Sequence, residues 1–424
     1  MKHRYTASLP RFAPRLLALL LCAALLAGCS AAPRETEAPA SGADVSIDVS
    51  ETYPPDTSPT EAAGQSGPAL AEDGFAILFV NVGKADAAIL RFGDTAVLID
   101  TGTAESVPRL IAGFNALDIS QIDAVFITHS HSDHLGGLAA LSANYAIPVV
   151  YSPYYAETDK NGVGKIVKRA EKLGLAHQEL KAGDTVAITD SVSFSVIGPL
   201  LLNEDDDNDN SLVLQFTYGG HTFLFTGDMQ FPEEQTLIDA GVFLKSDVLK
   251  VGNHGNPDAT GDDFGALVSP ALAVISTDTA VDTDSANPRV YAALQSAKIV
   301  VTQDYPIGVL LTLDRAGALS LSSPARSMDA ARISVSSLDV QTQTVTLTND
   351  GGERADLSGY TLFCARSDAA LRFPEGTTLD AGESLVVGGA SLPFPGEEKP
   401  LSKKKTNTVS LFDRLGSLIS KLEQ

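Results

Sequence analysis

The sequence contains no tryptophan, only three cysteines and few basic residues. Its 30 Lys and Arg residues stand against 53 Asp and Glu residues, which gives a formal net charge of −23. Such a charge repels polyanions unless cations or a local basic patch intervene, so the composition argues against a general nucleic-acid-binding protein. The cysteine count also excludes a disulfide scaffold: we expect Cys22 and Cys29 to fall in or beside an export signal, which leaves Cys364 as a buried thiol without a disulfide partner.

The first thirty residues are typical of a bacterial export signal. Basic residues precede the apolar run Leu16–Leu26, which is shorter than the roughly 20 residues that span a membrane. The segment Leu-Ala-Gly-Cys-Ser around Cys29 resembles a lipobox, and this resemblance implies cleavage and lipidation at that cysteine. We therefore expect a signal peptide at 1–28 and attachment to membrane lipid through Cys29 on the extracytoplasmic face. The alternative is an ordinary signal peptide with an incidental cysteine.

Three further regions differ in composition. Residues 29–72 are rich in Ala, Pro, Ser, Thr and Glu, which predicts a disordered tether. Residues 73–325 interleave apolar strands with helical patterns and indicate a layered α/β domain. From 332 to 424 short alternating strands are separated by turn signals, which predicts an all-β sandwich.

Four metal-ligand residues lie within six positions of one another. They are His129, His131, Asp133 and His134, and they follow a buried apolar strand expected at 124–128. Imidazole and carboxylate are the donors that hold zinc-like ions, and two ions about 3.5–4 Å apart can activate one water for attack. The alternative is a His-rich surface turn that binds metal adventitiously.

The pattern His-x-His-x-Asp-His resembles the signature of the metallo-β-lactamase-fold hydrolases. Other segments resemble the DNA-uptake (ComEC-like) type of that family, in the same order along the chain. These segments are Val82–Ala87, Leu98–Gly102, Asn208–Leu214, Phe225–Asp228 and Leu249–Gly255. The resemblance implies a four-layer αββα fold with two bound divalent ions, zinc or manganese.

The resemblance also implies a role for each ligand. His129 and His131 would bind the first ion, Asp133, His134 and His254 the second, and Asp228 would bridge the two. Asp133 and Asp228 would thereby take part in catalysis.

Two positions depart from the family pattern. Where most enzymes of the fold have a third His on the first metal, this chain has Asn210, which we expect beside the metal or substrate. Where the group has two adjacent His residues, the first is replaced by Asn253, which cannot transfer a proton. A degenerate metal site is therefore an open alternative.

The region 332–424 resembles a lamin-tail domain, which implies an immunoglobulin-like sandwich. The segments that carry this resemblance are Val345–Gly351, Ala355–Leu362 and Phe373–Leu385. It predicts an accessory module that binds a cell-wall or protein partner.

The sequence thus predicts an extracytoplasmic, metal-dependent hydrolase acting on phosphodiesters, with DNA or RNA as the first candidate substrate. Two alternatives stay open. One is a hydrolase of another ester, such as a wall-polymer phosphodiester, a phosphocholine ester or a lactone. The other is a non-catalytic surface lipoprotein with a degenerate metal site.

Overall fold

The computed structural model describes residues 74–154, 163–314, 316–325, 331–389 and 392–424. The predicted export signal at 1–28, the predicted tether at 29–72 and Cys29 lie outside the described residues. Every described helix is too short or too polar to cross a bilayer.

The central strands of residues 74–325 are buried on both faces. In β1 (Ala76–Val80), Ile77 and Phe79 enter one hydrophobic core while Leu78 enters another. In β10 (His221–Phe225), Phe223 enters the same core as Phe79, whereas Leu224 enters a third core. Because successive side chains of a strand point to opposite faces, two sheets must share the core between them, and each sheet has a second covered face.

The first sheet has eight strands in the order β15-β14-β1-β2-β3-β4-β5-β6. Its other strands are β2 (Ala88–Phe92), β3 (Thr95–Ile99), β4 (Ala124–Phe126), β5 (Val150–Pro153), β6 (His177–Leu180), β14 (Gly308–Leu313) and β15 (Leu319–Ser322). Strands β3 to β6 are parallel, whereas the others pair antiparallel.

The second sheet has seven strands in the order β13-β12-β11-β10-β9-β8-β7. Its other strands are β7 (Thr185–Ala187), β8 (Ser193–Gly198), β9 (Val213–Tyr218), β11 (Val248–Lys250), β12 (Leu272–Ile275) and β13 (Lys298–Val301). Strands β10 to β13 are parallel, so their carboxyl ends meet at one edge of the sheet.

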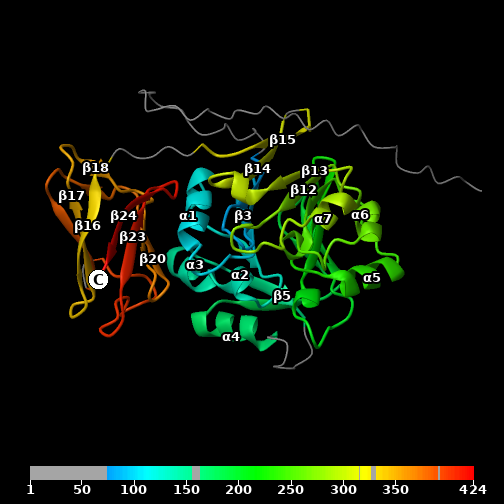
Figure 1. Cartoon of the computed structure of the whole chain (residues 1–424), viewed down its shortest axis with the longest axis horizontal. Helices are drawn as coiled ribbons and strands as arrows, with labels where there is room; N and C mark the ends of the chain where they lie inside the picture. Colours follow the sequence, from blue (N-terminus) through cyan, green and yellow to red (C-terminus); the bar gives the residue numbers. More distant parts are fainter. Residues whose placement is uncertain (1–73, 155–162, 315, 326–330, 390–391) are drawn as a thin grey trace, which may run out of the picture. The chain divides into compact units, whose positions relative to one another are not determined.

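Helices cover the outer face of each sheet (Figure 1). Leu110 and Leu141 pack in the core that contains Leu78, whereas Phe264 and Val290 pack in the core that contains Leu224. The helices are α1 (Val107–Ala116), α2 (Ser132–Leu135), α3 (Leu138–Asn144), α4 (Val163–Leu173), α5 (Phe231–Asp239), α6 (Asp262–Val268) and α7 (Pro288–Ala293), with 3-10 turns η2 (Asn208–Asn210), η3 (Gly252–Gly255) and η4 (Thr302–Asp304). The predicted α/β architecture is confirmed.

Some elements differ from the prediction. The polar segment at His177 forms edge strand β6, in which His177 pairs with Val150. The β6 segment is mostly polar because it is exposed at the edge of the sheet, so its sequence lacks the usual alternation. Helix α6 carries little periodic signal in the sequence, since it is only seven residues long.

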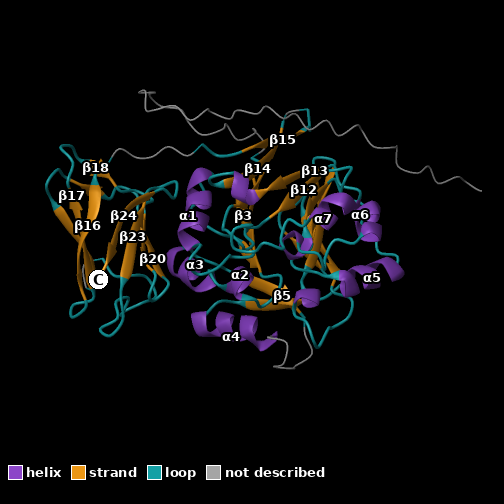
Figure 2. Cartoon of the chain, in the orientation of Figure 1, coloured by secondary structure: helices purple, strands orange, loops and turns teal. Residues whose placement is uncertain are grey.

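From 332 onward, the helices and strands of the described residues are all strands (Figure 2). Its three sheets have the orders β16-β17-β22, β18-β21 and β20-β19-β23-β24. The strands are β16 (Ile333–Asp339), β17 (Thr344–Asn349), β18 (Ala355–Asp356), β19 (Thr361–Cys364), β20 (Ala369–Arg372), β21 (Thr378–Leu379), β22 (Ser384–Gly388), β23 (Thr408–Phe412) and β24 (Leu418–Glu423). Val345 and Leu362 belong to one core, which joins the three- and four-stranded sheets. The predicted all-β character is confirmed, while the immunoglobulin-like topology and the lamin-tail likeness stay predictions.

Cys364 is a buried free thiol in this core, as expected. Burial raises the pKa of the thiol to about 12, so it stays protonated and unreactive.

Candidate metal centre

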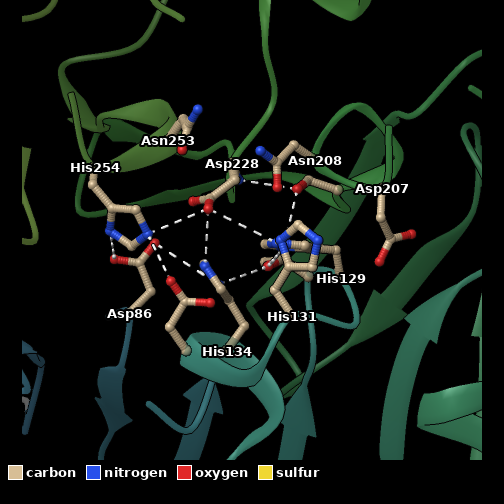
Figure 3. Close-up of polar contacts among 12 residues, drawn as sticks. Asp86, His129, His131, His134, Asp207, Asn208, Asp228, Asn253 and His254 are labelled. Atoms are coloured by element: carbon tan, nitrogen blue, oxygen red, sulfur yellow. Dashed lines mark hydrogen bonds and ion pairs between the residues drawn. The ribbon is translucent and has the colours of Figure 1, made fainter. Parts of the chain in front are cut away.

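The predicted ligands converge from loops that follow strands of both sheets (Figure 3). In the first sheet, β4 ends at Phe126 and leads into the segment that carries His129, His131, Asp133 and His134. In the second sheet, Asp228 follows β10 and His254 follows β11. The ligand atoms of Asp133, His134, Asp228 and His254 all lie within 4.8 Å of one another. This distance suits a single metal ion.

Neighbouring groups orient His134. Its Nδ1 lies 2.8 Å from Oδ2 of Asp100, a carboxylate that only accepts, so Nδ1 carries the proton of that bond. Nε2 lies 3.1 Å from Oδ2 of Asp228. The second nitrogen of the ring is therefore the one directed at the metal cluster, which is the usual arrangement for a ligating histidine.

The same logic applies to His254. Its Nδ1 donates to the backbone carbonyl of Ser276 at 2.9 Å. Its Nε2 lies 3.4 Å from Oδ2 of Asp133 and 3.3 Å from Oδ2 of Asp228. His134 and His254, from two separate segments, therefore both present Nε2 to Oδ2 of Asp228.

His129 and His131 form the other half of the cluster. Nε2 of His129 lies 3.0 Å from Nδ1 of His131 and 3.8 Å from Oδ2 of Asp228. The opposite nitrogen of His129 lies 3.2 Å from the hydroxyl of Thr128 and 3.4 Å from that of Ser211. His129 and His131 thus lie beside one another on the side of Asp228 opposite His254 (Figure 3).

The residues present fit a divalent cation at Asp133, His134, Asp228 and His254, and His129 and His131 offer two further imidazoles for a second cation. Oδ1 of Asp228, Oδ1 of Asp86 and Nε2 of His254 are buried without a hydrogen-bond partner among the described residues. A buried polar atom without a partner costs about 1–3 kcal/mol, so native structures normally satisfy such atoms. Divalent ions would satisfy these atoms, and imidazole and carboxylate donors suit zinc as well as manganese.

The charged side chains of the cluster shift one another's pKa values. Burial alone would lower the pKa values of His134 and His254, but Asp228 and its neighbours raise the first well above its ordinary value and the second to about 9. Burial alone would raise the pKa values of Asp228 and Asp133, but the two imidazoles hold both below the ordinary value. Burial and His134 lower the pKa of His129, which leaves it neutral. Without metal, the carboxylates are therefore anionic and protons occupy His134 and His254.

The backbone next to Asp228 leaves no room for a side chain. Gly227 has φ +53°, and a Cβ there would lie 2.8 Å from both Cβ of Thr128 and Cβ of Ser211. Ser211 accepts the N–H of Asp228 at 3.0 Å. The Gly-Asp pair after β10 is therefore needed to bring the carboxylate between the two sheets.

Three residues that support the ligands were not predicted as site residues. Asp100 holds His134, and Lys250 forms an ion pair with Asp86 at 2.8 Å between Nζ and Oδ2. Asp86 in turn lies 3.9 Å from Nδ1 of His254. The sequence did contain a signal for Asp86, Asp100 and Lys250. Each lies in a segment that carries the family resemblance, at or near the end of a buried strand.

The prediction for Asn210 was wrong. Its side-chain oxygen accepts the N–H of Asn203 at 2.8 Å, and its amide donates to the carbonyls of Asn203 and Asp206. Asn210 therefore closes a loop instead of facing the metal cluster. Asn208, two residues earlier, has a buried Oδ1 without a hydrogen-bond partner among the described residues, and Figure 3 shows its amide directed toward the cluster.

Asn253, which stands where the family has a His, is bound by the neighbouring loop. Its amide donates to Oδ1 of Asp258 at 2.9 Å, so the side chain supports the neighbouring loop. Asn253, His254 and Gly255 have φ values of +42°, +54° and +72°. This left-handed turn brings His254 to the cluster while Asn253 is held by Asp258.

Comparison with known proteins agrees with this geometry. Residues 80–279 match the sequence model of the metallo-beta-lactamase superfamily. This region is therefore similar to the metallo-beta-lactamase superfamily, and it contains every predicted metal ligand.

Part of the chain also resembles two competence proteins. It is similar to ComE operon protein 3 of Bacillus subtilis, with 33% identity over 167 residues that cover 39% of this chain and 21% of that protein. It is also similar to competence protein ComA of Neisseria gonorrhoeae, with 28% identity over 211 residues that cover 49% of this chain and 28% of that protein. The chain thus corresponds to less than a third of the length of either relative.

Among solved structures, the chain is similar to the metallo-beta-lactamase fold protein YhfI from Bacillus subtilis. That match has 12% identity and a TM-score of 0.40, and it covers 56% of this chain and 99% of YhfI.

Proposed function

We propose that this chain is an extracytoplasmic phosphodiesterase, with DNA or RNA as the first candidate substrate. The observation that carries the proposal is the cluster of Asp133, His134, Asp228 and His254, with His129 and His131 beside it. Divalent ions held by such donors supply an activated water and neutralise charge on a phosphoryl transition state. The similarity to competence proteins supports a substrate related to nucleic acid.

The residues of the chain prepare the centre for this reaction in two ways. Asp100 and Ser276 hold Nδ1 of His134 and His254, so the Nε2 atoms are already oriented. Asp228 and Asp133 stay anionic, so the cluster attracts cations before substrate binds. Preorganised donors cost little reorganisation during the reaction, which favours catalysis over passive metal storage.

We further propose that the lipid at Cys29 anchors the enzyme at the outer face of the membrane, and that the all-β region binds a cell-wall or protein partner. The lipobox-like segment and the lamin-tail resemblance support these assignments. The full sequence carries a formal net charge of −23, which predicts weak binding to a polyanionic substrate.

The test is a substrate panel with metal added back. The purified full chain, loaded with zinc or with manganese, is incubated with bis-p-nitrophenyl phosphate, single- and double-stranded DNA, RNA and phosphocholine esters. We expect metal-dependent release of acid-soluble nucleotides that His131→Ala reduces to background. His221→Ala is the matched control, since that imidazole donates to the Gly317 carbonyl away from the metal cluster.

The panel distinguishes the alternatives. Hydrolysis of phosphocholine esters without hydrolysis of nucleic acid would replace the substrate assignment by another ester. Stoichiometric metal with no turnover of any member of the panel would contradict the proposed activity.

A further inference from the structure

The loop between β1 and β2 places a lysine at the metal cluster. Nζ of Lys84 lies 2.9 Å from Oδ2 of Asp133, the oxygen that also lies 3.4 Å from Nε2 of His254. The side chain of Lys84 is 28% exposed, twice the 14% exposure of Asp133. The ammonium group is therefore at the edge of the cluster, between a metal ligand and solvent.

Lys250, a second lysine near the cluster, differs from Lys84 in its burial and in its hydrogen bonds. Lys250 is 6% exposed in its side chain, and its Nζ bonds Oδ2 of Asp86 at 2.8 Å and the Val251 carbonyl at 2.8 Å. An ammonium group has three N–H donors. The N–H groups of Lys250 therefore point into the protein interior. Among the described residues, Lys84 has one hydrogen-bond partner, Asp133.

We propose that Lys84 binds a non-bridging oxygen of the anionic phosphate group of the substrate. The inference rests on the proposed function, which supplies the substrate class. When Asp133 shares its charge with a divalent ion, its attraction for the ammonium group weakens. Lys84 then has N–H donors beside the cluster and a partly exposed side chain that a ligand can reach. A lysine acts as a point charge on phosphate, so it strengthens binding of anions without selecting one polymer.

The alternative is that Lys84 only positions Asp133 for metal binding. Both roles use the same contact, but they predict different consequences when the charge is removed. A substrate-binding lysine affects anion affinity at full metal content, whereas a positioning lysine affects the metal content itself.

The test measures binding of inorganic phosphate to the zinc-loaded full chain by isothermal titration calorimetry. We expect Lys84→Gln to weaken phosphate binding about ten-fold or more, with zinc content unchanged, and Lys84→Arg to stay within about three-fold of the wild type. Lys245→Gln is the control, since Lys245 is an exposed lysine that donates to the Ser269 carbonyl away from the metal cluster.

Two results would overturn the proposal: phosphate affinity that Lys84→Gln leaves unchanged, or loss of zinc from that variant. Phosphate binding needs no turnover, so the result for Lys84 can be read even if the wild type hydrolyses no phosphodiester. Failure of the proposed function would appear only in the substrate panel.

Discussion

Oδ2 of Asp100 lies 2.8 Å from Nδ1 of His134, and both side chains are almost completely buried. The carboxylate also receives the backbone N–H and the hydroxyl of Thr128 at 2.8 Å each. Asp100 thus joins the end of β3 to the ligand segment after β4 and determines which nitrogen of His134 faces the metal. Metal affinity should depend on this residue although it does not contact the metal.

The first prediction is that Asp100→Asn lowers zinc affinity about 10- to 100-fold, the usual effect of losing a carboxylate partner of a ligating histidine. Competition for zinc with a chromophoric chelator measures the zinc affinity of each variant. Asp94→Asn, in an exposed turn, serves as the control and should bind zinc as the wild type does. Equal affinities for Asp100→Asn and the control would contradict the role of Asp100.

A second prediction separates the two asparagines. Asn208→Ala should reduce retention of the first ion, because it removes an oxygen near His129 and His131, and should leave the metal-free protein as stable as before. Asn210→Ala should instead lower the free energy of unfolding by about 1–3 kcal/mol, because it leaves buried loop groups unpaired. The metal content and the urea unfolding of both variants test this prediction. Loss of metal from Asn210→Ala with unchanged metal content in Asn208→Ala would show that Asn210 is the residue that faces the metal.

Metal binding should release protons. Without metal, His134 and His254 hold protons because their pKa values are raised, for His254 to about 9. A metal ion needs the neutral imidazoles, so affinity should increase with pH up to about 9. Calorimetry in buffers of different ionisation enthalpy measures the number of protons released. We expect about one or more protons for each ion bound by His134 and His254 at neutral pH. His254→Gln should release fewer, and pH-independent binding by the wild type would be inconsistent with these shifts.

Stability should depend on pH through a carboxylate outside the metal cluster. Burial raises the pKa of Glu234 to about 7 from an ordinary value of 4.5, although it accepts the N–H groups of Thr260 and Gly261. The folded state thus binds the proton more tightly than the unfolded state. This contribution to stability is complete below pH 4.5 and is lost as the pH rises through 7.

Glu234→Gln mimics the protonated form, so its unfolding free energy should fall less between pH 5 and pH 8 than that of the wild type. Urea unfolding at several pH values gives the comparison. Glu204→Gln, in an exposed loop, should behave as the wild type. A wild-type pH dependence that Glu234→Gln leaves intact would show that this carboxyl group is not the cause.

The part of the site that the sequence predicted best is the part held in one short segment. His129, His131, Asp133 and His134 lie within six residues, so local spacing revealed them. Asp228 and His254 are distant along the chain and were predicted through the family resemblance. Strand β4 was predictable from its apolar residues, because it is buried on both faces.

The errors have physical causes. Asn208 and Asn210 lie at opposite ends of the 3-10 turn η2, and no periodicity rule determines which of the two side chains faces inward. Asp100 and Lys84 act through contacts between loops, which spacing along the chain cannot reveal. The exposed edge strand β6 lacked an apolar pattern because only its last residue is fully buried.

The central claim is that Asp228 is shared by two cations, one beside His129 and His131 and one beside His134 and His254. The most direct measurement is the metal content of the purified, metal-loaded full chain by plasma mass spectrometry, with Asp228→Asn as the comparison. We predict about two ions per chain in the wild type and a large loss in the variant. A wild-type content below about 0.5 ions per chain, or a variant that retains the wild-type content, would contradict the claim.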